Sequence, residues 1–350
     1  MQNKIRFIVR SVEENDLHDL KELAHQSSLV SLPPDKSLLN HLVQSSIRSF
    51  AGQIPFKDAV YIFVLEDLFQ KKVIGESLVH ASCASEVHPY YFFNIIEKTK
   101  KDPQLNIEMT HQALRLSSET GGLSMCGGLI LDREFHSRPE ELGSVIALTR
   151  FIYMGMFKEQ FNPTVLSEVV APLSKEGSNP FWDAVGKPFT GINFERFLEL
   201  SRQGNMDFAG RLLPEEDIYF CLLDKSVQPS EERLRQTVGK LAKHIIERVG
   251  FRYMKRIHLH GGPILGVDLE EIRLIKEGAF FKSAVCELPQ SMAKMAFLGA
   301  FKNSRFTGGH FPVIVQGERA CLDKPALRAL DLEENEPIFL CPADTCRKRN

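Results

Sequence analysis

The sequence lacks the features that mark several large classes of protein. No run approaches the roughly 20 apolar residues of a membrane-spanning helix, and the first residues mix basic and acidic side chains, unlike a signal peptide. The formal net charge is -2 at pH 7, without the clustered basic excess that is usual for nucleic-acid binding. We therefore expect a cytoplasmic protein with no membrane or nucleic-acid partner.

Cysteine pairs and hydrolase motifs are also missing. The 7 cysteines are scattered and include no CxxC pair, which argues against a disulfide framework and against a zinc ribbon. No GxSxG string of a serine hydrolase occurs. The glycines and lysine between Gly177 and Lys187 are too widely spaced for a phosphate-binding loop. Serine hydrolases and nucleotide hydrolases are thereby excluded.

Length and composition describe an ordinary folded chain of two domains. Hydrophobic residues make up 43% and charged residues 25% of the 350 residues, close to the averages of soluble globular proteins. A chain of this length favours two domains, each with a sizeable core. We expect the first over residues 1–200 and the second over residues 201–350, the latter ending in a small β-rich region.

Hydrophobic periodicity predicts a mixed α/β fold. Segments rich in β-branched residues indicate strands, and leucines at helical spacing indicate amphipathic helices. Strands are expected at 5–12, 59–66, 73–81, 126–131, 165–171, 264–267, 313–316 and 338–341, and helices at 14–24, 36–50, 144–157 and 178–189. The polar stretch 67–72 joins two of these strands as an antiparallel hairpin. Hairpins together with one strand–helix–strand crossover are typical of mixed α/β domains.

A faint internal repeat accompanies this order. The segments 178–189 and 234–253 each read as a helix that ends at a glycine and is followed by an aromatic residue. Two such units suggest a duplicated fold. The alternative is chance, because glycine is the usual residue just after a helix end.

Several strings resemble arginine N-succinyltransferases, a family of the GNAT superfamily of acyl-CoA-dependent acyltransferases. They are YIFVLED at 61–67, FKEQFN at 157–162, NPFWDAVGKPF at 179–189, GFRY at 250–253 and GGPIL at 261–265. FWxxxGKxF and GGPxL in this order and spacing are together quite specific. The resemblance implies a tandem GNAT-type fold whose first domain binds acyl-CoA. It also implies transfer of a succinyl group from succinyl-CoA to the α-amine of arginine.

The resemblance implies where succinyl-CoA binds. In GNAT enzymes a central strand splays from its neighbour, its free backbone amides pair with the pantetheine arm, and the next helix points its start at the pyrophosphate. Free N–H groups and the helix dipole favour an anion there. In this sequence the strand is 126–131, with Leu129 and Leu131 as contact positions, and the helix begins near Gly143. The alternative is that Leu129 is only a core strand residue.

The pyrophosphate loop departs from the superfamily pattern at one position. That pattern is Arg or Gln, two residues, Gly, one residue, then Gly or Ala. Here Arg138 and Gly143 are kept, but Glu141 stands where the first glycine belongs. Acidic side chains at Glu140 and Glu141 repel a diphosphate unless they point away from it.

A second departure concerns the proton donor that acyl transfer to an amine needs for the leaving thiolate. The family has a histidine in a Val-His-Pro string. Here the local match is Gln228, and counting back from Gly250 gives Gln236 instead. Glutamine supplies no proton near neutral pH. Three readings stay open: an active enzyme in which another group takes over, an acyltransferase with a different amine acceptor, and a CoA-binding partner subunit in a homo- or hetero-oligomer.

Three further side chains are candidates for the acceptor site. Glu168, on the strand after the pyrophosphate helix, is the carboxylate expected to meet an arginine substrate, and a structural salt bridge is the alternative. His258 and His260 are expected on one face of a strand, at a spacing that metals can use. Because no third ligand is near them in the sequence, we expect packing residues and no metal.

Overall fold

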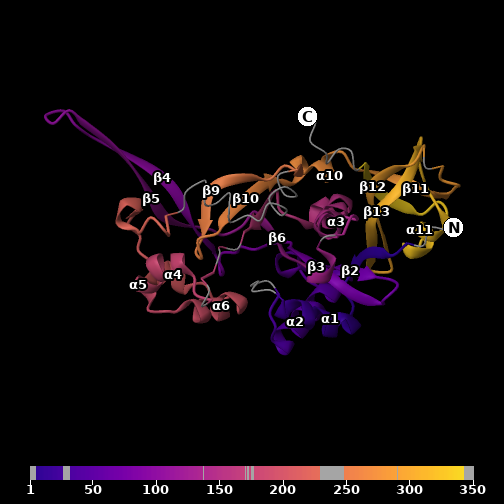
Figure 1. The fold of residues 1–350 in the computed structure, drawn as a ribbon, viewed down its shortest axis with the longest axis horizontal. Helices are drawn as coiled ribbons and strands as arrows, with labels where there is room; N and C mark the ends of the chain where they lie inside the picture. Colours follow the sequence, from indigo (N-terminus) through magenta and orange to yellow (C-terminus); the bar gives the residue numbers. More distant parts are fainter. Residues whose placement is uncertain are drawn as a thin grey trace.

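The structure is a computed structural model of the chain, and one mixed sheet runs through it (Figure 1). It describes residues 5–26, 32–136, 138–169, 171, 173–174, 177–228, 248–289 and 291–342. The strands are β1 (Phe7–Ser11), β2 (Val60–Asp67), β3 (Lys72–His80), β4 (Tyr90–Asp102), β5 (Ile107–Glu119), β6 (Leu123–Leu131), β7 (Thr164–Glu168), β8 (Ile218–Tyr219), β9 (Arg252–His258), β10 (Pro263–Asp268), β11 (Ala279–Val285), β12 (Lys294–Lys302), β13 (Arg305–Gln316), β14 (Arg319–Leu322) and β15 (Pro337–Pro342). The helices are α1 (Leu17–His25), α2 (Lys36–Phe50), α3 (Leu142–Met156), α4 (Pro180–Val185), α5 (Lys187–Thr190), α6 (Phe194–Arg202), α7 (Phe208–Leu212), α10 (Arg273–Lys276) and α11 (Lys324–Ala329).

The strand order is β12-β15-β11-β14-β13-β1-β2-β3-β6-β7-β10-β9-β4-β5-β8. An additional pairing of β12 with β13 closes the five C-terminal strands on themselves, around a core of their own. This closed unit is the β-rich region that the sequence predicted, and it joins the remaining sheet where β13 pairs with β1. Closure leaves these strands without a free edge between them.

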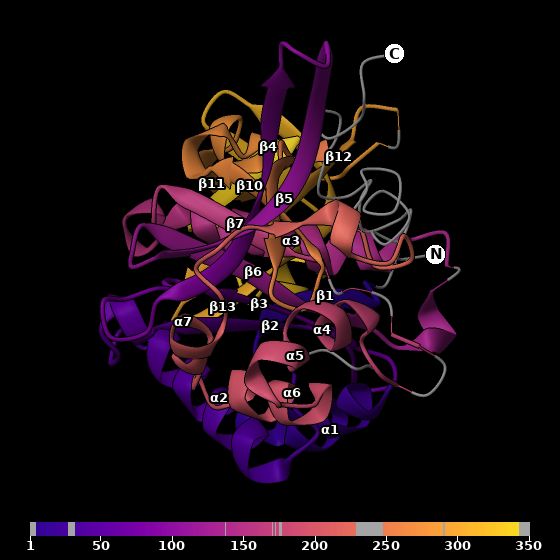
Figure 2. The same ribbon diagram turned by 90° about the vertical axis from the view of Figure 1, so that its left-hand side faces the viewer.

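Alternation along β2 explains why helices cover both faces of the sheet. Tyr61, Phe63 and Leu65 belong to the core cluster that contains α3, whereas Ile62 and Val64 belong to the cluster that contains α1 and α2. Successive side chains of a strand point to opposite faces, so each face has its own helical layer. In both views α1, α2 and α4–α6 lie low in the molecule, below the sheet (Figures 1 and 2).

Helix α3 is apolar on nearly all sides because it is enclosed. It contacts β2, β3 and β6 of the central sheet and β12, β13 and β15 of the C-terminal unit. An all-round apolar helix is typical of such a buried position. None of the helices in the described parts of the chain has the length and apolarity that crossing a membrane would take.

The predicted elements up to β7 are confirmed, with one large addition. Strands β4 and β5 form a long antiparallel hairpin that projects from the body (Figure 1). Its outer residues are largely exposed on both faces, so they show no period-2 burial signal. The sequence patterns therefore did not reveal this hairpin.

The division at residue 200 stays a prediction. Strands β9 and β10, which follow that boundary, lie within the central sheet between β7 and β4. The second unit of the proposed repeat, 234–253, falls mostly on residues 229–247, outside the described residues.

Candidate functional site

One edge of strand β6 is open where its pairing with β7 ends. Strands β6 and β7 run parallel, and their ladder ends at the pair Cys126↔Ser167. Strand β6 continues to Leu131, and along this stretch its partner is β3. We call residues 127–131 the open edge of β6, because no strand of the described chain pairs with its side facing β7. Unpaired backbone groups at such a splay can bind an extended ligand.

Leu129 and Leu131 lie on this open edge. Both side chains are partly buried and pack against the core cluster of α3. A leucine side chain offers no polar group, so only the backbone at these positions can hydrogen-bond a ligand. The roles of these two residues in binding stay predictions.

A β-bulge lies at Gly128 on the open edge of β6, where the register with β3 shifts. Gly128 has φ 66°, and a Cβ there would lie 2.8 Å from a carboxylate oxygen of Glu76 on β3. Glu76 is fully buried, and neither of its oxygens has a hydrogen-bond partner. Burial raises the pKa of Glu76 well above its usual range, although Arg150 lowers it in part. This carboxyl group could not be predicted from the sequence, because nothing in a strand pattern marks a single buried acid.

The loop before α3 has a left-handed backbone conformation, which glycine usually adopts, at a residue that is not glycine. Glu141 precedes the helix with φ 51° and ψ 44°, a left-handed conformation, and Gly143 lies in the first turn of α3. This conformation costs a non-glycine residue about 1 kcal/mol. The exposed Glu141 side chain does not cap the helix. The guanidinium of Arg138 lies over the rings of Phe135 and Phe7, at 4.8 Å and 5.9 Å from their centroids.

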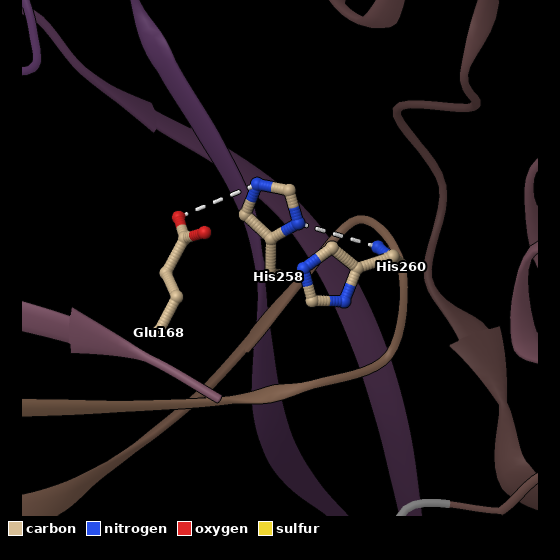
Figure 3. Close-up of side chains that lie close together, drawn as sticks. All are labelled: Glu168, His258 and His260. Atoms are coloured by element: carbon tan, nitrogen blue, oxygen red, sulfur yellow. Dashed lines mark hydrogen bonds and ion pairs between the residues drawn. The ribbon is translucent and has the colours of Figure 1, made fainter. Parts of the chain in front are cut away.

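Strand β7 ends in a buried polar cluster. The Glu168 cluster consists of Tyr90, Glu168, His258 and His260 (Figure 3 shows the last three). The Tyr90 hydroxyl donates to Glu168 Oε1 at 2.6 Å, and His258 Nε2 lies 3.4 Å from the same oxygen. Burial raises the pKa of Glu168, partly opposed by His260, Tyr90 and His80. Glu168 is thus a carboxylate that gains from a cationic partner.

The two imidazoles of this cluster are neutral at physiological pH. Burial lowers the pKa of His258 to about 3 and that of His260 to about 3. The contact of His258 with Glu168 therefore joins a neutral ring to a carboxylate and is not an ion pair. An uncharged imidazole with a free nitrogen is also the form that ligates metals.

A tight turn after β9 brings the histidines together. The prediction that both lie on one strand face is wrong, because β9 ends at His258 and His260 lies in the turn that follows. Gly261 there has φ 85°, and a Cβ on Gly262 would lie 1.8 Å from the carbonyl oxygen of Val169. The two glycines of the GGPIL string are thus required by the turn, which places the two imidazole rings 4.1 Å apart between centroids and tilted by 43°.

The expectation that the histidines lack a third ligand nearby is also wrong. The register of β10 with β7 pairs Ile264 with Glu168 and so places the turn beside this carboxylate. One ligand atom each of Glu168, His258 and His260 lies within 4.8 Å of the others. These residues are about 90 positions apart, so only the strand pairing could reveal their proximity.

Of the two glutamines that could stand at the family's histidine position, the structure describes only Gln228. Gln228 donates from Nε2 to the carbonyls of Phe220 and Leu223, each at 2.9 Å. Its amide is therefore committed to its own loop. Gln236 lies outside the described residues.

The chain resembles known proteins over most of its length. A family model described as "Arginine N-succinyltransferase beta subunit" matches residues 7–274. The chain is 28% identical over 334 residues to arginine N-succinyltransferases of Escherichia coli O6:K15:H31 (strain 536 / UPEC) and Shigella dysenteriae serotype 1 (strain Sd197). Each of these alignments covers 93% of this chain and 93% of the relative.

A solved structure shares the fold. It is that of arginine/ornithine succinyltransferase subunit AI from Pseudomonas aeruginosa, with a TM-score of 0.79 and 23% identity. The match covers 96% of this chain and 98% of the other. Together with the strand order, it confirms the mixed α/β fold that the sequence predicted.

Proposed function

This chain belongs to the arginine N-succinyltransferase family, and from that premise we propose that it transfers a succinyl group from succinyl-CoA to the α-amine of arginine in the cytoplasm. The observation that carries the proposal is the open edge of β6, which begins where the β6–β7 ladder ends at Ser167, one residue before Glu168, and from which the chain leads on to α3. A thioester carrier and an amine can meet there, one on each side of the splay.

The donor side relies on backbone groups. Amides of residues 127–131 would hydrogen-bond the extended arm of succinyl-CoA and polarise the thioester carbonyl as charge develops on its oxygen. The first-turn amides of α3, around Gly143, would hold the diphosphate with the help of the helix dipole. Leu129, Leu131 and Gly143 thus act through their main chain, and Arg138 supports the loop from its place over the aromatic rings.

The acceptor side relies on Glu168. An amine attacks the thioester carbon only when it is neutral, so its ammonium form must first lose a proton. We assign Glu168 as the group that accepts this proton. Tyr90 and His258 both contact Oε1 of its carboxylate and fix its orientation, and Oε2 would meet the substrate.

The hydrogen bonds of Gln228 favour a second reading. Because its amide is bound to two carbonyls of its own loop, it neither donates a proton to the thiolate nor adjusts to a ligand without breaking them. A member that binds CoA and pairs with a related, active subunit, or one that acts on a different amine, fits this observation. Both alternatives predict no succinylation of arginine by the isolated chain.

A thiol-release assay tests the proposal. The isolated chain is mixed with succinyl-CoA and with arginine, ornithine or a polyamine, and free CoA is measured over time. We expect release with arginine. Release only with another amine would assign a different acceptor. Calorimetric binding of succinyl-CoA without any release would indicate the partner subunit, and no binding at millimolar succinyl-CoA would exclude all three functions.

Removing the charge of Glu141 should tighten CoA binding. For Glu141→Gln we expect roughly a two- to fivefold lower Kd, the size of an exposed charge interaction, and a smaller gain at high salt because of screening. Calorimetry with CoA at two salt concentrations measures this. Glu141→Gly, which also removes the left-handed strain, is the matched comparison. Weaker binding by both variants would show that the diphosphate does not lie at this loop.

A further inference from the structure

The Glu168 cluster contains three metal-ligating side chains gathered around one point. Ligand atoms of Glu168, His258 and His260 lie within 4.8 Å of one another, and both histidines are buried. Acyl transfer as proposed above needs only the carboxylate of Glu168 and its contacts with Tyr90 and His258. It gives no role to His260. We propose that these three side chains bind a divalent transition metal ion, and that Zn²⁺ fits them best.

The spacing of the first two ligands already suits zinc. Bonds of about 2.0 Å at a tetrahedral centre separate two ligand atoms by about 3.3 Å. His258 Nε2 and Glu168 Oε1 are 3.4 Å apart. Only His260 must approach, and the centroid of its ring lies 4.1 Å from that of His258, with the two rings tilted by 43°. Side-chain rotation can close this gap without moving a strand.

The donor set selects the kind of metal. Two imidazoles and one carboxylate are ligands for Zn²⁺, Ni²⁺ or Cu²⁺, whereas Mg²⁺ and Ca²⁺ prefer oxygen ligands alone. The Tyr90 hydroxyl, which donates to Glu168 at 2.6 Å, is the outer partner that ligating carboxylates commonly have.

Metal binding must break two hydrogen bonds that backbone amides of the turn donate to the histidine rings. The amide of His260 donates to His258 Nδ1 at 3.4 Å, and that of Gly262 donates to His260 Nδ1 at 3.2 Å. These bonds place each imidazole proton on Nε2, so ligation through Nε2 moves the proton to Nδ1 and breaks them. Both donor–acceptor distances lie at or beyond the upper limit of the usual range for hydrogen bonds donated by N–H groups, so both bonds are weak. Metal binding should therefore speed hydrogen exchange at the amides of His260 and Gly262.

The consequence for activity rests on the proposed function. A metal on Glu168 takes the carboxylate that the amine needs, so zinc should act as an inhibitor competing with the amine. Removing metal should leave succinyl transfer intact.

Calorimetry with ZnCl₂ and the full chain, without either substrate, tests the inference. We expect one site that MgCl₂ does not fill, with Zn²⁺ affinity reduced roughly tenfold or more in His260→Gln and in Glu168→Gln. The control His88→Gln removes an exposed histidine outside the cluster and should bind as the unchanged chain does. Circular dichroism verifies that each variant is folded.

Anomalous scattering from a crystal of the unchanged chain soaked in ZnCl₂ tests the metal site without any substitution. Density between Glu168 and the two histidines is expected. Absence of the ion there, or equal Zn²⁺ affinity of His260→Gln and His88→Gln, overturns the metal site. A chain that succinylates arginine but binds no zinc refutes this inference alone, whereas one that binds zinc but releases no CoA refutes only the proposed function.

Discussion

Replacing Glu168 by glutamine is expected to lower kcat/KM for arginine by roughly 10² to 10⁴, the usual contribution of a positioned proton acceptor. Glutamine keeps the shape of the side chain and can still accept a hydrogen bond from Tyr90. It cannot take a proton from the amine. Steady-state thiol release measures the change, and KM for succinyl-CoA should stay nearly constant because the donor site is separate.

The pH profile separates this role from a structural one. Burial raises the pKa of Glu168 above its ordinary range, and only its ionised form accepts a proton. In the unchanged chain kcat/KM should therefore rise with pH as Glu168 deprotonates, at a higher pH than an exposed glutamate would give. Glu168→Gln should lose this acid limb.

Glu270→Gln is the matched control. Glu270 is an exposed carboxylate paired with Lys158, and its replacement should leave both rate and profile unchanged. Full activity of Glu168→Gln with an unaltered acid limb would remove Glu168 from the chemistry.

Gly262→Ala should have the largest effect on stability. The new Cβ would lie 1.8 Å from the backbone carbonyl of Val169 and 2.7 Å from the His260 ring, and a backbone atom cannot rotate away. We expect the free energy of unfolding to fall by about 3 kcal/mol, the upper part of the range for overpacking. Because the turn carries both histidines, affinity for Zn²⁺ should fall as well. Urea unfolding and zinc titration measure the two effects.

Gly121→Ala provides the comparison for this variant. Gly121 has open space where a Cβ would be and no left-handed backbone, so alanine there should change stability little. If Gly262→Ala were as stable as Gly121→Ala, the close approach of the turn to β7 would be disproved.

Local patterns were sufficient for the elements that build the donor side. The apolar runs of 59–66 and 144–157 each follow from burial on both sides, and β2 and α3 occur there. The helix start near Gly143 was expected from the resemblance to the pyrophosphate loop, and α3 begins at Leu142. The outer part of the β4–β5 hairpin is not buried, so its sequence has no such pattern. This hairpin was therefore not predicted.

The acceptor side could be predicted only in part. Glu168 was predicted because it is a carboxylate on the strand after the pyrophosphate helix, where it could meet an arginine substrate. Its partners Tyr90 and His258 come from strands that the β10–β7 register and the β4–β9 pairing bring beside it. Such long-range pairing is not encoded in spacing, and Glu76, a single acid under Gly128, was missed for the same reason.

A crystal structure with succinyl-CoA bound tests the central claim most directly. The account predicts the pantetheine arm along residues 127–131 of β6, the diphosphate at the first-turn amides of α3 near Gly143, and the thioester facing Glu168. A cofactor bound elsewhere, or strands β6 and β7 paired along their whole length in the complex, would contradict it.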